Sequence, residues 1–134
     1  MRPEPLNEGK RWLRQAEEDL SDARFLREWE RYHLACFMAQ QAAEKALKAY
    51  LYAQGPEALW GHSVADLAEA ASAFDQAFAA LKERVAPLDQ YYLPTRYPNT
   101  LPGGIPVEAF TDYDAQRALS LAEEVLRFVS ERLV

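Results

Sequence analysis

The stretch YHLACFMAQQAAEKALKAYLYAQG, residues 32–55, decides the fold. Alanines recur along one side of the helix that it predicts, larger apolar residues lie on the adjoining side, and Gly55-Pro56 ends the pattern. The apolar arc covers more than half of the circumference, so this helix is central. The alanine side allows close approach of another helix, within the chain or across a dimer; it comprises Ala35, Ala39, Ala42, Ala46 and Ala53.

The remaining arc of this helix is polar and contains His33, Gln40, Gln41, Glu44, Lys45 and Lys48. Glu44 and Lys48 are spaced for an i,i+4 ion pair. A solvated surface is the simplest interpretation for most of these side chains.

A first helix is predicted over residues 7–30, where Trp12, Leu20 and Leu26 belong to one apolar stripe. Asp19 falls in the middle of that stripe. Because an unpaired buried carboxylate is costly, Asp19 either makes a polar helix-packing contact or faces a shared cleft as a site residue.

Cap signals mark the later helices. Ser63 followed by Asp66 predicts a helix start, and helical spacing then continues as far as Leu81. We expect two helices here, with a break near Ser72, where Ser72 and Asp75 form a second cap signal.

Proline shapes the last third of the chain. Pro87 bends or ends the helical pattern, and the last helix begins at Thr111 or Asp112. Four of the eight prolines fall within residues 93–110, which predicts a long Pro-rich loop of a length that is often functional. The whole predicts an all-α fold, an antiparallel helical bundle of four to five helices forming a single domain over residues 1–134.

Composition excludes several classes of protein. The net charge of −6 argues against a broad nucleic-acid surface, because phosphate contacts require Lys and Arg. The single Cys36 gives no internal disulfide, and no zinc-ligand spacing or other metal site is predicted. There is no apolar run long enough for a membrane helix and no signal peptide, so the expected location is the cytoplasm. A Gly-rich phosphate loop, a nucleophile elbow and a His-Glu-x-x-His motif are all absent.

Three separated segments share a recognisable pattern: the run from Ala35 to Lys48, the Gly61-His62-Ser63 cap, and Tyr91-Tyr92-Leu93-Pro94-Thr95-Arg96-Tyr97-Pro98. Together with Ala16-x-x-Asp19-Leu20-x-x-Ala23 in the first helix, they resemble the HEPN domain family. The resemblance covers nearly the whole chain and keeps the order of the family's segments.

The resemblance implies an all-α bundle that commonly dimerises, and one of two activities. Some small HEPN proteins accompany a separately encoded minimal nucleotidyltransferase and bind its substrate or nucleotide. Others are metal-independent RNase toxins carrying an Arg, four to six residues and then a His. Arg96 matches that arginine, but no histidine occurs after His62, so the sequence departs from the RNase pattern.

The leading hypothesis is therefore a non-catalytic protein that binds a nucleotide or substrate as the companion of a separately encoded minimal nucleotidyltransferase and needs no further cofactor. Arg96 would bind a phosphate and Tyr97 would stack on a base. The neighbouring cleft would be lined by Asp19, Gln40, Glu44 and Lys45. In the alternative role, Arg96 is structural and ties the loop to Asp19 or Glu44.

Two other functions stay open. One is an RNase toxin with a degenerate motif, for which Arg27, five intervening residues and His33 give a formal match at the wrong place for the family. The other is a helical adaptor that binds a protein. We also expect a homodimer or a dimer of dimers, in which the loop of residues 93–110 borders the interface.

Overall fold

The computed structural model describes residues 4–55 and 61–133. Six α-helices and two 3₁₀ turns, but no strand, occur in these two ranges, which confirms the all-α prediction. The elements are α1 (Pro5–Glu28), α2 (Tyr32–Ala53), α3 (Val64–Ser72), α4 (Ala77–Val85), η1 (Ala86–Tyr91), η2 (Pro98–Thr100), α5 (Pro106–Ala109) and α6 (Asp112–Ser130).

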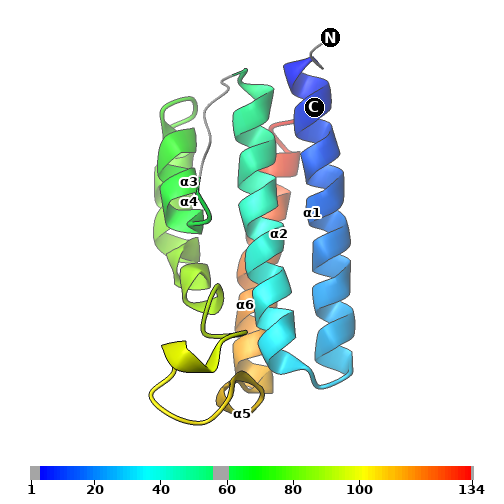
Figure 1. Cartoon of the computed structure of the whole chain (residues 1–134). Helices are drawn as coiled ribbons and strands as arrows, with labels where there is room; N and C mark the ends of the chain where they lie inside the picture. The colour runs from blue at the N-terminus through cyan, green and yellow to red at the C-terminus, as the bar shows by residue number, and fades with distance from the viewer. Residues whose placement is uncertain (1–3, 56–60, 134) are drawn as a thin grey trace.

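The three long helices α1, α2 and α6 run side by side, and α3 and α4 lie along the other side of α2 (Figure 1). The two 3₁₀ turns and the single-turn α5 lie towards the end of the bundle where α1 passes into α2. Glu30, in that connection, has a φ of 60°, in the left-handed region that non-glycine residues seldom adopt. α1 begins and ends two residues earlier than predicted, at Pro5 and Glu28.

The alanine side of α2 is covered within the chain. A Cβ atom on Gly9 of α1 would lie 2.6 Å from the carbonyl oxygen of Ala49 and 2.9 Å from the Cβ of Ala53. Ala35, Ala39, Ala42 and Ala46 are fully buried in the single chain. The close helix approach that the sequence predicts is thus made inside the chain, and this alanine side is not left free for a dimer.

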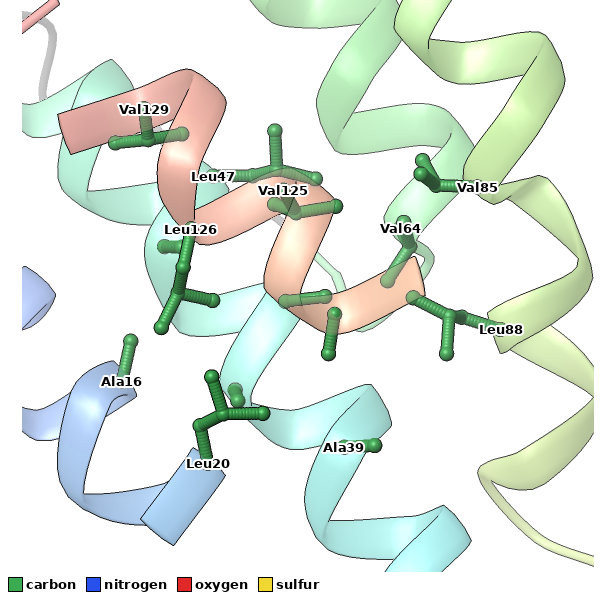
Figure 2. Packing of buried hydrophobic residues seen from close by; sticks show 14 of the residues in the cluster. Ala16, Leu20, Ala39, Leu47, Val64, Val85, Leu88, Val125, Leu126 and Val129 are labelled. Atoms are coloured by element: carbon green, nitrogen blue, oxygen red, sulfur yellow. The ribbon is translucent and has the colours of Figure 1, made fainter. Parts of the chain in front are cut away.

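The core lies between α2 and its neighbours. Figure 2 shows Val125, Leu126 and Val129 of α6 beside Leu47 of α2, with Ala16 and Leu20 of α1 on one side and Val64, Val85 and Leu88 on the other. Every one of these residues is at least 94% buried.

The predicted caps are mostly present. Asp66 N donates to Ser63 Oγ at 3.0 Å, and the Thr111–Asp114 cap also forms. The break between α3 and α4 is confirmed, but its cap comes from Asp75 alone, which accepts from the backbone of Ala77 at 3.0 Å. The Ser72 hydroxyl instead donates to the carbonyl of Glu69, within its own helix.

The long loop of residues 93–110 is less irregular than expected, because it contains η2 and α5. Both elements start with a proline, whose fixed φ suits a first helical position. Proline, which rules out a long helix in this segment, therefore starts the two short helical elements η2 and α5.

No helix in residues 4–55 or 61–133 is both long enough and apolar enough to cross a membrane.

Candidate functional site

Arg96 sits in a box of aromatic rings. Its Cζ lies 4.1 Å from the ring centre of Phe37 in α2, 4.9 Å from that of Tyr92 and 5.1 Å from that of Tyr97. Its Nε and Nη2 both donate to the carbonyl oxygen of Tyr92, at 2.9 and 2.8 Å. These contacts fix the plane of the guanidinium while leaving its Nη1 hydrogens free of them.

The charge of Arg96 is not compensated by a carboxylate in the part of the chain that the structure describes. Asp19 and Glu44, the carboxylates that a structural role would use, pair with Lys45 and Lys48 instead. The arrangement therefore presents an oriented, half-buried cation beside the exposed ring of Tyr97.

His62 joins this group from the segment before α3. Its imidazole stacks on Tyr92 with ring centres 4.9 Å apart and planes 19° apart, and its side chain is 58% exposed. Its Nδ1 lies 3.2 Å from Oε2 of Glu44, and its backbone carbonyl accepts from Gln40 Nε2 at 2.9 Å. Sequence reasoning left His62 out of the site, although the resemblance already rested on the Gly61-His62-Ser63 cap.

Glu44 and Gln40 belong to the site as buried supports. Glu44 is 4% exposed and Gln40 is fully buried, so neither belongs to a solvated surface. Glu44 also accepts from Lys48 Nζ at 3.0 Å and from Gln41 Nε2 at 3.3 Å. Buried contacts of these residues hold His62 in place.

Asp19 and Lys45 form a separate pair between α1 and α2. Lys45 Nζ donates to Asp19 Oδ2 at 2.5 Å, Gln15 donates to Oδ1 at 2.9 Å, and Asp19 is 3% exposed. Of the two roles open to Asp19, the structure shows the buried one with partners. Lys45 lines an open groove of about 740 Å³ together with residues of α1, among them Trp12 and Gln15.

Arg27 and His33 are not brought together. Arg27 Nε donates to Asp112 Oδ1 at 2.7 Å and thereby ties α1 to α6. This hydrogen bond is the main cause of a lowered pKa for Asp112 and a raised one for Arg27. His33 is 8% exposed, and its pKa is lowered by burial and by the charge of Arg31.

The single cysteine, Cys36, is buried. Burial raises the pKa of Cys36 to about 12, which keeps the thiol protonated. Within residues 4–55 and 61–133, no three His, Cys, Asp or Glu side chains gather in a way that could hold a metal ion.

Known proteins resemble this chain over almost its entire length. A sequence model of the HEPN domain matches residues 10–133. A Methanocaldococcus jannaschii protein named "Putative toxin MJ1304" is 26% identical, with 92% of this chain and 87% of that protein covered.

Solved structures are similar in fold and in sequence. TT1696 from Thermus thermophilus has a TM-score of 0.78 at 38% identity, covering 93% of this chain and 98% of that one. ST0689, an archaeal HEPN homologue, also has a TM-score of 0.78, at 35% identity, covering 95% and 98%. A HEPN domain protein from Thermotoga maritima, TM0613, has a TM-score of 0.71 at 31% identity, covering 92% and 97%.

Proposed function

The chain belongs to the HEPN domain family, and from that premise we propose that it is a non-catalytic companion of a separately encoded minimal nucleotidyltransferase and binds a nucleotide or substrate at Arg96 and Tyr97. The observation that carries the proposal is the Arg96 guanidinium, which is oriented by aromatic rings and by a backbone carbonyl and has no carboxylate partner in the described ranges.

The geometry suits a phosphate together with a ring. The Nη1 hydrogens of Arg96 would donate to phosphate oxygens, and such charge-assisted hydrogen bonds are about twice as strong as neutral ones. Tyr97 is 48% exposed, so its face would stack on a base, a contact worth about 1–3 kcal/mol.

Titration calorimetry with adenosine and guanosine mono-, di- and triphosphates, with and without Mg²⁺, tests the binding. We expect heat with at least one of them and a loss of affinity of about tenfold or more in Arg96→Ala, because one charge-assisted contact of about 1.5–3 kcal/mol is removed. Arg127→Ala is the matched control, since it removes the same charge from an exposed position in α6. The absence of heat with every nucleotide would refute direct nucleotide binding.

The companion role requires its own experiment. A minimal nucleotidyltransferase from the same genome should be retained by the immobilised protein, and its activity should change when the wild type is added. Arg96→Ala should alter that response and Arg127→Ala should not. An enzyme that is retained but responds equally to both variants would favour the adaptor function instead.

We further propose a homodimer or a dimer of dimers. Phe25 and Trp29 near the end of α1 and Tyr113 at the start of α6 are 61%, 73% and 73% exposed, and aromatic residues are enriched at subunit contacts. The Arg27–Asp112 pair holds these two helix ends together. Light scattering should give twice or four times the 15.3 kDa of the chain; a mass that stays near 15.3 kDa at micromolar concentration would refute assembly.

A second candidate function is that of an RNA-cleaving toxin. The name of the Methanocaldococcus jannaschii relative, "Putative toxin MJ1304", favours a toxin. RNA cleavage is supported by His62, whose imidazole is largely exposed and stacks on the Tyr92 ring that Arg96 also contacts. His33, which the sequence offers as the base, is buried. Growth arrest on expression that disappears in His62→Ala but persists in His33→Ala would favour this function over the companion role.

A further inference from the structure

We propose that Thr95 is the positioning residue of the Arg96 site: its buried hydroxyl fixes the turn that makes Arg96 offer the end of its guanidinium, and not the side, to a phosphate. This inference rests on the proposed nucleotide binding. It adds which edge of the arginine the ligand meets and which residue determines that edge.

Thr95 is a fully buried polar residue outside the long helices. Five polar or charged residues are buried in residues 4–55 and 61–133, and the other four belong to α1 or α2. The Thr95 hydroxyl donates to the carbonyl oxygen of Tyr91 at 2.6 Å, and Tyr91 is itself 5% exposed. Because a buried carbonyl without a hydrogen bond is costly, this contact strongly favours the observed turn.

The side chain of Arg96 repeats the contact of Thr95 one residue later. Thr95 bonds the carbonyl four residues before it, and the Arg96 guanidinium likewise bonds the Tyr92 carbonyl, at 2.9 and 2.8 Å. In an α-helix the backbone amide of Arg96 would take that carbonyl. Here the amides of Arg96 and Tyr97 both donate to Leu93 O instead, at 3.0 and 3.1 Å. The Tyr92 carbonyl is therefore open to the guanidinium only while the chain keeps this turn.

The Tyr92 carbonyl determines which edge of Arg96 is free. It accepts from Nε and Nη2, which together form the side of the guanidinium. The hydrogens of Nη1 and the second hydrogen of Nη2 take no part in these two bonds, and they lie at the end of the group. Two oxygens of one phosphate can accept in parallel at that end. A side-on phosphate would have to break the bond to Tyr92.

A second arginine in the chain shows what Arg96 lacks. The Cζ of Arg132 lies 3.6 Å from the ring centre of Phe128, and its Nη1 donates to the carbonyl of the same residue at 2.9 Å. Its Nε donates to a carboxylate, Asp75 Oδ2, at 2.8 Å. No carboxylate in the described ranges does this for Arg96, so its orientation depends on the turn that the Thr95 hydroxyl stabilises.

The first measurement needs no ligand. The Nε–H of Arg96 is bonded to a carbonyl beside three rings, so its NMR signal in isotope-labelled protein should be shifted by ring currents; Arg96→Ala identifies the signal. In Thr95→Val, which lacks the hydroxyl, we expect it to move to the position of a solvated arginine. In Thr95→Ser, which keeps the hydroxyl, it should stay in place.

The control separates positioning from stability. Val129→Ala removes buried methyl groups near the end of α6 and should lower stability without moving the Arg96 signal. A circular-dichroism melt checks that each variant is folded. Thr95→Ala replaces Thr95→Val if the latter does not fold, because the smaller side chain leaves room for a water beside the Tyr91 carbonyl.

The second measurement is titration calorimetry with adenosine 5′-monophosphate. We expect affinity to fall about tenfold in Thr95→Val, because the ligand must then immobilise a free arginine side chain. Thr95→Ser and Val129→Ala should bind as the wild type does. In the wild type the Nε–H signal of Arg96 should stay close to its ligand-free position when the nucleotide is added, since the phosphate meets the other end of the group. A large shift of that signal would overturn the end-on geometry.

The outcomes separate the two proposals. If no nucleotide binds the wild type, the proposed nucleotide binding fails; the ligand-free signal still decides whether Thr95 orients the guanidinium. If the nucleotide binds and Arg96→Ala abolishes binding, but Thr95→Val matches the wild type in signal and affinity, only the inference about Thr95 is overturned. Equal effects in Thr95→Val and Val129→Ala would also overturn it, because loss of stability alone would then explain them.

Discussion

The two sides of α2 are built on opposite principles. Towards α1, Gly9, Ala49 and Ala53 bring the two backbones so close that no further atom fits. Towards α3 and η1, Gln40 and Glu44 place buried polar groups against the segment that carries His62. The first side depends on the absence of side chains, and the second on hydrogen bonds that must all be made. One helix can therefore pack tightly against α1 along the seam formed by Gly9, Ala49 and Ala53, and support a site with polar groups on a different arc.

The largest loss of stability is expected from a substitution at Gly9 in this seam. In Gly9→Ala the new methyl group would meet the Ala49 carbonyl oxygen at 2.6 Å, and a backbone atom inside a helix cannot move away cheaply. We expect the free energy of unfolding to fall by about 3 kcal/mol. Denaturant unfolding measures it, with Gly61→Ala as the control, since nothing lies within 4 Å of the Cβ added there. Equal stability of the two variants would show that the seam is looser than the structure has it.

On the polar side of α2, the largest loss of stability is expected from a substitution at Glu44. Glu44→Ala leaves Lys48 Nζ, on a side chain that is 11% exposed, without its carboxylate, and frees the His62 ring. We expect a loss of about 2 kcal/mol in the free energy of unfolding, because a buried charge left unpaired is costly. The control is Glu69→Ala, which removes a carboxylate that is 63% exposed and pairs with Lys82; it should change stability little. A Glu44→Ala variant as stable as Glu69→Ala would mean that the polar side contributes only to the site.

The connection between α1 and α2 can be made more stable by a substitution at Glu30. Glu30 has a φ of 60°, a conformation that costs a residue with a side chain more than it costs glycine. Glu30→Gly should therefore raise the free energy of unfolding by about 0.5–1 kcal/mol. Glu28→Gly, at the last position of α1, serves as the comparison and should be destabilising. A loss of stability in Glu30→Gly would show that the backbone conformation of Glu30 does not cost the folded state stability.

The smallest effect is expected outside both sides, at the Arg27–Asp112 pair. Its hydrogen bond lowers the pKa of Asp112, so the folded state holds a proton there less readily than the unfolded state. The stabilisation is present at neutral pH and disappears as pH falls below about 4 and through the lowered pKa. Asp112→Asn should lower Tm slightly at pH 7 and match the wild type in strong acid; the shift is small because both side chains are partly exposed. A Tm difference between the wild type and Asp112→Asn that grows as the pH falls would contradict this prediction.

Local signals in the sequence predicted the elements well. The caps at Ser63 and Thr111 and the break before α4 are confirmed, because each depends on residues within one turn of the helix end. The wide apolar arc of α2 placed that helix at the centre, which the burial of its alanines confirms. The short helix α5 was missed, because prolines signal a break and a helix start alike.

The candidate site was predictable only in part. The motif resemblance pointed to Arg96 and Tyr97, but Asp19 and Lys45 proved to belong to a different pair between α1 and α2. The helical pattern predicts on which side of a helix Asp19 and Lys45 lie, but not which residue each of them pairs with. Asp89 had no local signal, because its role at the start of α3 depends on a residue 26 positions away.

The sequence by itself determined the long helices, most of their caps and the alanine side of α2, because periodicity and capping act over a few residues. Only the tertiary structure decided that Arg96 lies among three aromatic rings without a carboxylate partner in the described ranges, and that His62 stacks on one of those rings, Tyr92, while its Nδ1 lies near Glu44. These contacts join α2, the segment before α3 and the segment after η1. Which groups meet there depends on how the helices pack, and whether a charge is compensated depends on every group that packing brings within reach.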